Sequence, residues 1–358
     1  EFDMLVLAVG AVPAADTESV RQMVSLSKSH GGFLKEAHAK LRPVDTPTKG
    51  VYIAGAAESP KDVRESVTQA SAASSRASIL LQKNHFAVEA ITAVIYEEPC
   101  TRCGQCANVC PFGAITWEKK QVPQIISAAC AGCGTCAAEC KFGAIEMRHF
   151  SDQAIYAQID AILEENGQEK IVTFACNWCS YAGADTAGLS RMAYPPHAFI
   201  IRTMCSGRVH PQFVWYAFQK GSPVVLVSGC HYVDCHYIDA NRSTVRRIDG
   251  LWDKLIKMGI RPERLMLEWC SAAEGGRWQT IMQEAEKKRR SVTSEEIELS
   301  RSELSKVRVP RPRNPKPTDE NTAAQFHWGR CTPLPSRAFH TGVGCGFPCQ
   351  LISAVSAL

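Results

Sequence analysis

The sequence predicts a multidomain protein of the α/β and α+β classes, and three observations lead to this prediction. The chain has 358 residues, which is too long for one ordinary hydrophobic core. A cysteine pattern occurs twice between residues 100 and 140, which indicates a small domain built by internal duplication. Apolar runs of strand length alternate with helical patterns after residue 171, which predicts a parallel sheet covered by helices.

The sequence pattern of residues 1–90 predicts half of a doubly wound α/β domain. The apolar run 4–10 is interpreted as a buried strand that enters a glycine turn, and residues 50–55 as a second strand. Helices are expected at 17–27 and 63–82. The second helix is rich in Ala and Ser, so its backbone could pack closely against a sheet or a cofactor. The sequence has no initiating Met, and we interpret it as starting within a domain.

Residues 91–150 contain the most specific motif. The spacing Cys-x2-Cys-x2-Cys-x3-Cys occurs twice, and each copy closes with Phe-Gly-Ala-Ile. Three closely spaced thiolates of one copy bind one [4Fe–4S] cubane, while the fourth cysteine reaches the other cubane. Paired four-cysteine zinc sites are the alternative, but they do not require this duplication. We therefore predict a bacterial-type 2[4Fe–4S] ferredoxin domain. Its ligand sets are Cys100, Cys103, Cys106 and Cys140 for the first cluster, and Cys130, Cys133, Cys136 and Cys110 for the second.

Residues 151–290 predict a second α/β domain with a parallel sheet. The expected strands are 171–175, 198–203, 223–228 and 264–269, and the expected helices lie near 211–220, 243–258 and 273–290. Cysteines follow each of the first three strands. Because functional loops converge at the carboxyl ends of parallel strands, we expect five thiols in one crevice. They are Cys176, Cys179, Cys205, Cys230 and Cys235.

Three kinds of site are compatible with these five thiols. Four of them would hold a [2Fe–2S] cluster, with His231 or His236 as a substitute ligand. A second interpretation is a redox-active pair of Cys176 and Cys179, because Cys-x-x-Cys between a strand and a helix supports thiol–disulfide exchange. A third is structural zinc.

The C-terminal part has a different composition. Residues 291–325 form a charged segment with helical character and a Pro-rich linker at 309–317. Residues 326–358 form a tail of unknown role. Its three cysteines make an incomplete ligand set, so we predict no cluster there. They are Cys331, Cys345 and Cys349.

Composition limits the kinds of binding partner and the cellular compartment that we expect for this protein. The net charge is only +4, from 40 basic and 36 acidic residues, so we expect no nucleic-acid binding. No apolar run approaches the roughly 20 residues that cross a bilayer, so we expect no direct membrane span. Seventeen cysteines without a signal peptide indicate a reducing compartment, and we expect a cytoplasmic protein.

Several motifs carry a family resemblance. Residues 50–56 contain Gly-Val-Tyr-Ile-Ala-Gly-Ala, and residues 60–63 contain Pro-Lys-Asp-Val. The later motifs are Cys176-x2-Cys179, Arg202-x2-Cys205-Ser206-Gly207-Arg208-Val209, Gly229-Cys230-His231 and Asp234-Cys235-His236-Tyr237. Over roughly residues 1–290 the sequence resembles the A subunit of heterodisulfide reductase, joined to a domain similar to the delta subunit of methyl-viologen-reducing hydrogenase (MvhD-like). The fusion is also similar to the B subunit of the quinone-interacting membrane-bound oxidoreductase (QmoB-like).

The resemblance implies two cofactors besides the cubanes. One is a [2Fe–2S] cluster among the five cysteines of residues 151–290. The other is FAD, because residues 1–90 look like the C-terminal part of an FAD-binding domain. A Gly-x-Gly-x-x-Gly phosphate loop is absent from this sequence, so we expect FAD to bind in the complete protein. Cys270 stands where the delta-subunit pattern usually has an aliphatic residue. The implied FAD contacts are Gly55, Ala56, Lys61, Asp62 and Gln69.

These features predict an oxidoreductase subunit without a catalytic acid, base or nucleophile. We expect it to relay electrons between the [2Fe–2S] module, the two [4Fe–4S] clusters and FAD. The expected partners are proteins similar to the B and C subunits of heterodisulfide reductase, and a hydrogenase or formate dehydrogenase. The alternatives are a subunit that links a quinone pool to the enzymes of sulfate reduction, a thiol–disulfide oxidoreductase, and a zinc-stabilised docking scaffold.

Overall fold

The computed structural model divides the chain after residue 313, and the described residues all belong to the first unit, 1–313. The Pro-rich linker, the tail and its three cysteines lie outside them. The described residues are 3–6, 9–24, 26–29, 31–39, 41–48, 50–82, 91–232 and 234–307.

The second half of the first unit contains a four-stranded parallel sheet. Its strands are β5 (Ile171–Cys176), β6 (Ala198–Thr203), β7 (Val225–Gly229) and β8 (Leu265–Trp269), in the spatial order β6-β5-β7-β8. This confirms the predicted parallel sheet, and each strand lies within two residues of its predicted range. Every residue of β5 and β7 is buried, which explains why their sequences are continuous apolar runs instead of alternating ones.

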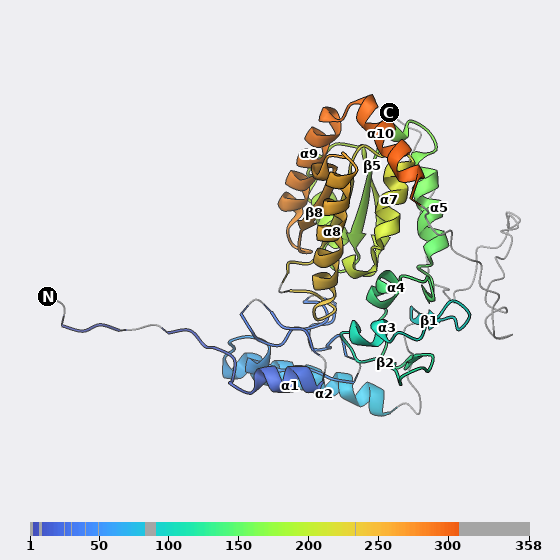
Figure 1. Cartoon of the computed structure of the whole chain (residues 1–358). Helices are drawn as coiled ribbons and strands as arrows, with labels where there is room; N and C mark the ends of the chain where they lie inside the picture. Colours follow the sequence, from blue (N-terminus) through green and yellow to red (C-terminus); the bar gives the residue numbers. More distant parts are fainter. Residues whose placement is uncertain are drawn as a thin grey trace, which may run out of the picture. The chain divides into compact units, whose positions relative to one another are not determined.

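Helices cover both faces of this sheet (Figure 1). On one face, Phe213 of α7 shares a hydrophobic core with Phe174 of β5. On the other face, Ala184 of α6 and Trp278 of α9 share a core with Leu226 of β7. The helices are α5 (Asp152–Leu163), α6 (Ser180–Leu189), α7 (Pro211–Gln219), α8 (Ala240–Lys257), α9 (Gly275–Ser291) and α10 (Ser294–Ser305), with short 3₁₀ turns η2 (Gly167–Glu169), η3 (Ser206–Arg208) and η4 (Pro262–Arg264).

The charged segment after residue 291 is helical, as α10 shows. Its N-terminus is a capping box, in which the Thr293 side chain accepts from the Glu296 amide and the Glu296 carboxylate accepts from the Thr293 amide. Helix α7 also begins with a side-chain cap. Pro211 occupies its first turn, and the His210 ring accepts a hydrogen bond from the Gln212 amide.

None of the described helices is both long and apolar enough to cross a bilayer.

The duplicated cysteine sequence forms a duplicated structure. The short helices α3 (Gln105–Asn108) and α4 (Thr135–Glu139) occupy equivalent places in the two copies, and each follows a glycine in the left-handed region. Two antiparallel ribbons complete the domain. They pair β1 (Ala93–Ile95) with β4 (Ile145–Met147), and β2 (Ile115–Thr116) with β3 (Gln124–Ile125).

The N-terminal region differs from the prediction. Its described elements are α1 (Thr17–Met23), the 3₁₀ turn η1 (Gly55–Ala57) and α2 (Val63–Leu81). The predicted strand at 4–10 is wrong for its described residues, because they are not extended against any partner and Met4 is 79% exposed. The predicted strand at 50–55 contributes only an isolated bridge between Asp45 and Tyr52. No residue of α2 is buried, so its Ala-rich surface does not pack against a sheet within the described residues.

Candidate metal centres

Five cysteines gather at the carboxyl edge of the parallel sheet. Cys176 ends β5, Cys179 precedes α6, Cys205 follows β6, and Cys230 and Cys235 lie in the loop after β7. Their side chains are between 1% and 7% exposed. The structure therefore brings together the five cysteines that the sequence predicted for one crevice.

The five thiols are in mutual contact. The sulfurs of Cys176, Cys179 and Cys230 all lie within 4.8 Å of one another. The Cys205 thiol reaches those of Cys176 and Cys235, and the Cys235 thiol reaches that of Cys230. Four of the thiols thus form a closed ring of contacts, with Cys179 beside one edge of it. Soft sulfur donors at this density suit an iron–sulfur cluster or zinc.

The electrostatics of this group favour a bound cation. The thiols of Cys176 and Cys235 raise the pKa of Cys205 well above its usual range, and burial does the same for Cys179. The pKa of Cys230 is well below its usual range, because the neighbouring thiols of Cys176, Cys179 and Cys235 stabilise its thiolate. The protein alone therefore does not stabilise several thiolates together, whereas bound iron or zinc would. The donor set fits a metal cluster.

Neither candidate histidine joins the thiol group among the described residues. The Nε2 atom of His231 lies 2.6 Å from a carboxylate oxygen of Glu274. The His236 ring stacks on the Trp178 ring at 4.1 Å between centroids, and burial lowers the pKa of His236 to about 4. The thiols alone supply enough ligands for a cluster.

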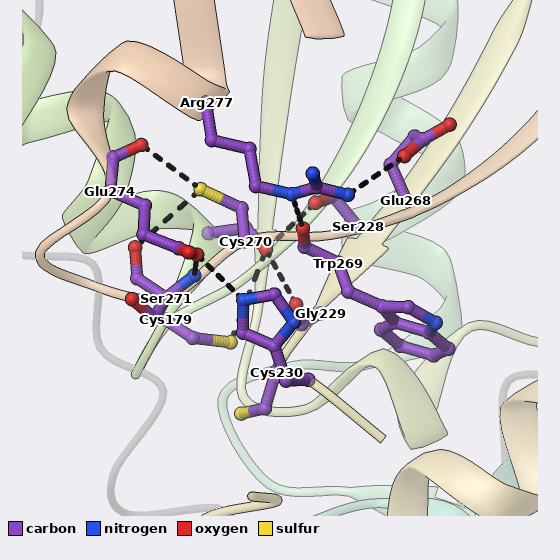
Figure 2. Close-up of polar contacts among 12 residues, drawn as sticks. Cys179, Ser228, Gly229, Cys230, Glu268, Trp269, Cys270, Ser271, Glu274 and Arg277 are labelled. Carbon is purple, nitrogen blue, oxygen red and sulfur yellow. Dashed lines mark hydrogen bonds and ion pairs between the residues drawn. The ribbon is translucent and has the colours of Figure 1, made fainter.

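Cys270 has a different environment from the five cysteines. It follows β8, which is separated from β5 by β7. Its sulfur lies toward the backbone oxygens of Ser271 and Glu274, at 3.5 Å from each (Figure 2). The side chain is fully buried and packs with α6, where a methyl group on Gly183 would approach the Cys270 sulfur to 3.0 Å. Burial raises its pKa to about 12. Because the Cys270 sulfur faces backbone oxygens and lies outside the thiol group, we interpret Cys270 as a packing residue.

The second ferredoxin ligand set surrounds a small cavity. Its four cysteines line this cavity together with Pro111, Gly132 and Gly134. Gly132 and Gly134 have φ values of +77° and +80°, which glycine tolerates better than any other residue. The four cysteines are Cys110, Cys130, Cys133 and Cys136. Burial raises the pKa of Cys110 and Cys136, and it raises that of Cys133 to about 11.

The first ferredoxin ligand set is also assembled. Burial raises the pKa of Cys106 to about 11, and the charges of Cys140, Cys100 and Cys103 add to this increase because those thiols lie nearby. Unlike the others, Cys103 is exposed.

Backbone amides donate to sulfur at equivalent places in the two copies. The Ala114 amide donates to the Cys110 sulfur at 3.3 Å, and the Ala144 amide donates to the Cys140 sulfur at 3.3 Å. Such hydrogen bonds stabilise thiolate charge, and they tune iron–sulfur potentials.

The second ferredoxin set lies beside the five-cysteine group. Cys133 shares one buried cluster with Cys205, Cys235 and Tyr237, and the Phe112 ring packs against it. We name this cluster the junction; Ala240 is also buried in it, and Ala131 and Trp178 pack against it. The sequence predicted the cysteines of the junction but not that two ligand sets would meet there.

Two arginines also join the modules: Arg208 was predicted only as part of a family motif, and Arg247 was not predicted. Arg208 is 1% exposed, donates to the Phe150 carbonyl and pairs with Asp152. Arg247 of α8 pairs with Glu139 of α4 at 2.5 Å. Arg208 lies three residues after Cys205, and this short distance from a predicted ligand was a feature of the sequence that indicated a role for it.

The residues implied for FAD form one small unit at the start of α2. The Gly55 amide donates to the Gln69 side chain at 2.7 Å, and Lys61 pairs with Glu58 at 2.6 Å. Asp62 caps α2, and Ala56 is exposed in the η1 turn. These polar groups are thus paired with each other or with the backbone, and FAD binding stays a prediction for the complete protein.

The fold and the sites together define an iron–sulfur electron-transfer protein. Residues 99–144 match the family model of the 4Fe-4S dicluster domain, and residues 171–292 match that of the methyl-viologen-reducing hydrogenase delta subunit. Its relatives include a hydrogenase iron-sulfur D subunit that the chain covers over 83% of its length at 50% identity. The chain therefore belongs to the hydrogenase delta-subunit family, here joined to a part similar to the A subunit of heterodisulfide reductase. This confirms the predicted resemblance to these two families.

The curated relatives include subunits of heterodisulfide reductases and of hydrogenases. The A subunit of the ferredoxin/F(420)H(2)-dependent CoB-CoM heterodisulfide reductase from Methanosarcina acetivorans is 41% identical over 283 residues, which is 79% of this chain and 36% of that protein. The iron-sulfur D subunit of the F420-non-reducing hydrogenase vhc from Methanococcus voltae is 50% identical over 120 residues, which is 34% of this chain and 83% of that protein. The A subunit of the H(2):CoB-CoM heterodisulfide,ferredoxin reductase from Methanothermobacter thermautotrophicus is 51% identical over 168 residues, covering 47% of this chain and 25% of that protein. The chain thus spans about a third of the Methanosarcina protein.

Proposed function

We propose that this chain is the electron-transfer part of a heterodisulfide reductase-type complex in the cytoplasm. It would relay electrons between the five-cysteine site, the two ferredoxin sites and FAD in the complete protein. The observation that carries this proposal is the junction, where Cys133 of one ligand set is buried with Cys205 and Cys235 of another. When bound, each iron–sulfur cluster takes up and releases one electron.

The contacts define the order of the sites along the chain's interior. The five-cysteine group adjoins the second ferredoxin set through the junction. The second set adjoins the first, because Cys106 and Cys136 share the ferredoxin core. This order supports a path with the five-cysteine site at one end and the first ferredoxin set at the other end. Electrons could enter at the five-cysteine site or travel the reverse way.

The protein's own contribution is to hold thiolates close together and to keep water away. Most of the predicted ligands are buried or half-buried, and amide groups donate to the sulfurs of Cys110 and Cys140. Cys103 is the exposed exception and belongs to the far set. An exposed ligand at the end of the path fits an exchange of electrons with another centre or protein.

The proposed cofactors are two [4Fe–4S] clusters, one [2Fe–2S] cluster held by four of the five cysteines, and FAD. The names of the relatives support partner subunits of the heterodisulfide reductase and hydrogenase types. Formate dehydrogenase is a further proposed electron donor.

The test is iron and sulfide analysis of the anaerobically purified chain, with electron paramagnetic resonance after dithionite reduction. We expect about ten irons and a [2Fe–2S] signal. The variants Cys205→Ala and Cys230→Ala should lose that signal, whereas Cys270→Ala is the matched control, since Cys270 is an equally buried cysteine after a neighbouring strand. About eight irons plus zinc would refute the third cluster and favour a docking scaffold.

A further inference from the structure

Tyr237 fills the space between two of the ligand sets. It follows Cys235 by two residues, is only 2% exposed, and is buried with Cys133 and Cys205 in the junction. The Phe112 ring of the ferredoxin domain meets the Tyr237 ring edge-on, at 6.2 Å between centroids. The Tyr237 hydroxyl group is therefore enclosed by protein and not hydrated from the surface.

The hydrogen bonds of this hydroxyl are incomplete. The indole N–H of Trp178 donates to it at 2.7 Å, which uses one of its acceptor positions. A tyrosine hydroxyl also has one proton to donate. No nitrogen or oxygen atom of a described residue accepts that proton. A buried donor without an acceptor is unfavourable.

The junction offers sulfur atoms as acceptors for this donor. Tyr237 is buried there in one cluster with Cys133, Cys205 and Cys235. Two of these three belong to the five-cysteine group. Trp178, which fixes the hydroxyl, lies between Cys176 and Cys179 in the same group.

We propose that the Tyr237 hydroxyl donates a hydrogen bond to a sulfur atom of the iron–sulfur site held by the five-cysteine group, and thereby favours its reduced form. This inference rests on the proposed function. Reduction adds negative charge to the cluster, and hydrogen bonds to sulfur stabilise that charge. Tyr237 is then a positioning residue that tunes the potential and does not bind iron.

The surrounding rings hold the hydroxyl in place. The Trp178 ring stacks on the His236 ring at 4.1 Å, with 17° between their planes. The His236 ring in turn stands nearly perpendicular to the Tyr237 ring at 4.8 Å. Three packed aromatic side chains leave the hydroxyl little freedom, so the donor is oriented before an electron arrives.

The test is Tyr237→Phe in the full chain, because this change removes only the hydroxyl and keeps the ring that fills the junction. We expect iron and sulfide content to stay unchanged and the unfolding midpoint to fall only slightly, because the Trp178 N–H loses its acceptor. At a fixed ambient potential, the ratio of reduced to oxidised [2Fe–2S] sites should fall about tenfold. For a one-electron couple, this corresponds to a midpoint potential that is about 59 mV lower. The ferredoxin midpoints should not move.

A second measurement detects the hydrogen bond itself. In the reduced wild type, pulsed electron paramagnetic resonance should show a strongly coupled proton at the [2Fe–2S] site that exchanges in D2O. This signal should be missing from Tyr237→Phe. The matched control is Tyr156→Phe, because Tyr156 is also a buried tyrosine but packs between Phe213 and Tyr216, in the core beside α5 and α7. It should leave every midpoint and the exchangeable proton unchanged.

The outcomes separate this inference from the proposed function. A wild-type chain without a cluster at the five-cysteine site would refute both. A loaded site with the same midpoint and the same exchangeable proton in Tyr237→Phe would overturn the inference alone. A shift confined to a ferredoxin cluster would also overturn it, since the bond would then belong to the other ligand set.

Discussion

Replacing Gly132 with alanine should remove the second ferredoxin cluster, and the structure gives the magnitude of the effect. Gly132 lies between Cys130 and Cys133 with φ +77°, and an added Cβ would lie 2.4 Å from the Ile91 carbonyl oxygen. The left-handed conformation costs an alanine about 1–2 kcal/mol. The clash with a backbone atom adds about 1–3 kcal/mol, because no side chain can rotate away from it. The sum is a destabilisation of about 2–5 kcal/mol.

The matched control for this change is Gly113→Ala. Gly113 has φ +58° in the same domain, but nothing lies within 4 Å of its added Cβ. The control should therefore cost only the conformational strain, about 1–2 kcal/mol. The assay is anaerobic denaturant unfolding together with iron content. Gly132→Ala should lose about four irons, whereas Gly113→Ala should keep them. Equal stability losses and equal iron contents would show that the close approach to Ile91 does not limit this loop.

Three further predictions follow from other parts of the structure. Cys270→Ala should keep the full iron content and lower the free energy of unfolding by about 1–2 kcal/mol, because only a small buried group is lost; loss of iron would place Cys270 among the ligands. Burial lowers the pKa of His210 from 6.5 to about 4. As the pH falls, this histidine therefore binds a proton in the unfolded chain before it does so in the folded chain. Stability should therefore fall by about 2 kcal/mol between pH 7 and pH 5 in denaturant titrations. His210→Asn keeps a helix cap and should remove this part of the pH dependence; an unchanged pH profile would contradict the assignment. Glu139→Gln should cost about 3 kcal/mol by leaving Arg247 buried without its partner, and the double variant with Arg247→Met should recover most of that loss; a double variant as unstable as the single one would contradict this.

The parts of the fold that were predictable from sequence are those fixed by local pattern. Continuous apolar runs such as 171–176 are buried on both faces, and their length and β-branched composition identify them as strands. The convergence of Cys176, Cys205 and Cys230 followed from the rule that parallel strands end at one edge. The iron–sulfur spacing fixed the ferredoxin domain in the same way.

The parts that were not predictable depend on contacts between distant segments. The run at 4–10 is as apolar as a strand, but a strand forms only by pairing, and the described residues offer it no partner. Cys270 follows a strand as the other cysteines do, yet the order of the sheet places it one strand too far from β5. The junction around Tyr237 joins the ferredoxin domain to the α/β domain. No local sequence pattern predicts where the surfaces of two domains meet.

The spatial order β6-β5-β7 has a consequence for how the protein matures in the cell. The cysteines of the five-cysteine group are spread over 176–235, and they meet only after β6 and β7 have both docked on β5. The complete ligand set therefore exists only in a chain whose sheet has formed. The assembled thiols are at most 7% exposed, so little solvent reaches them. The same closed arrangement then shields the loaded site from oxidants.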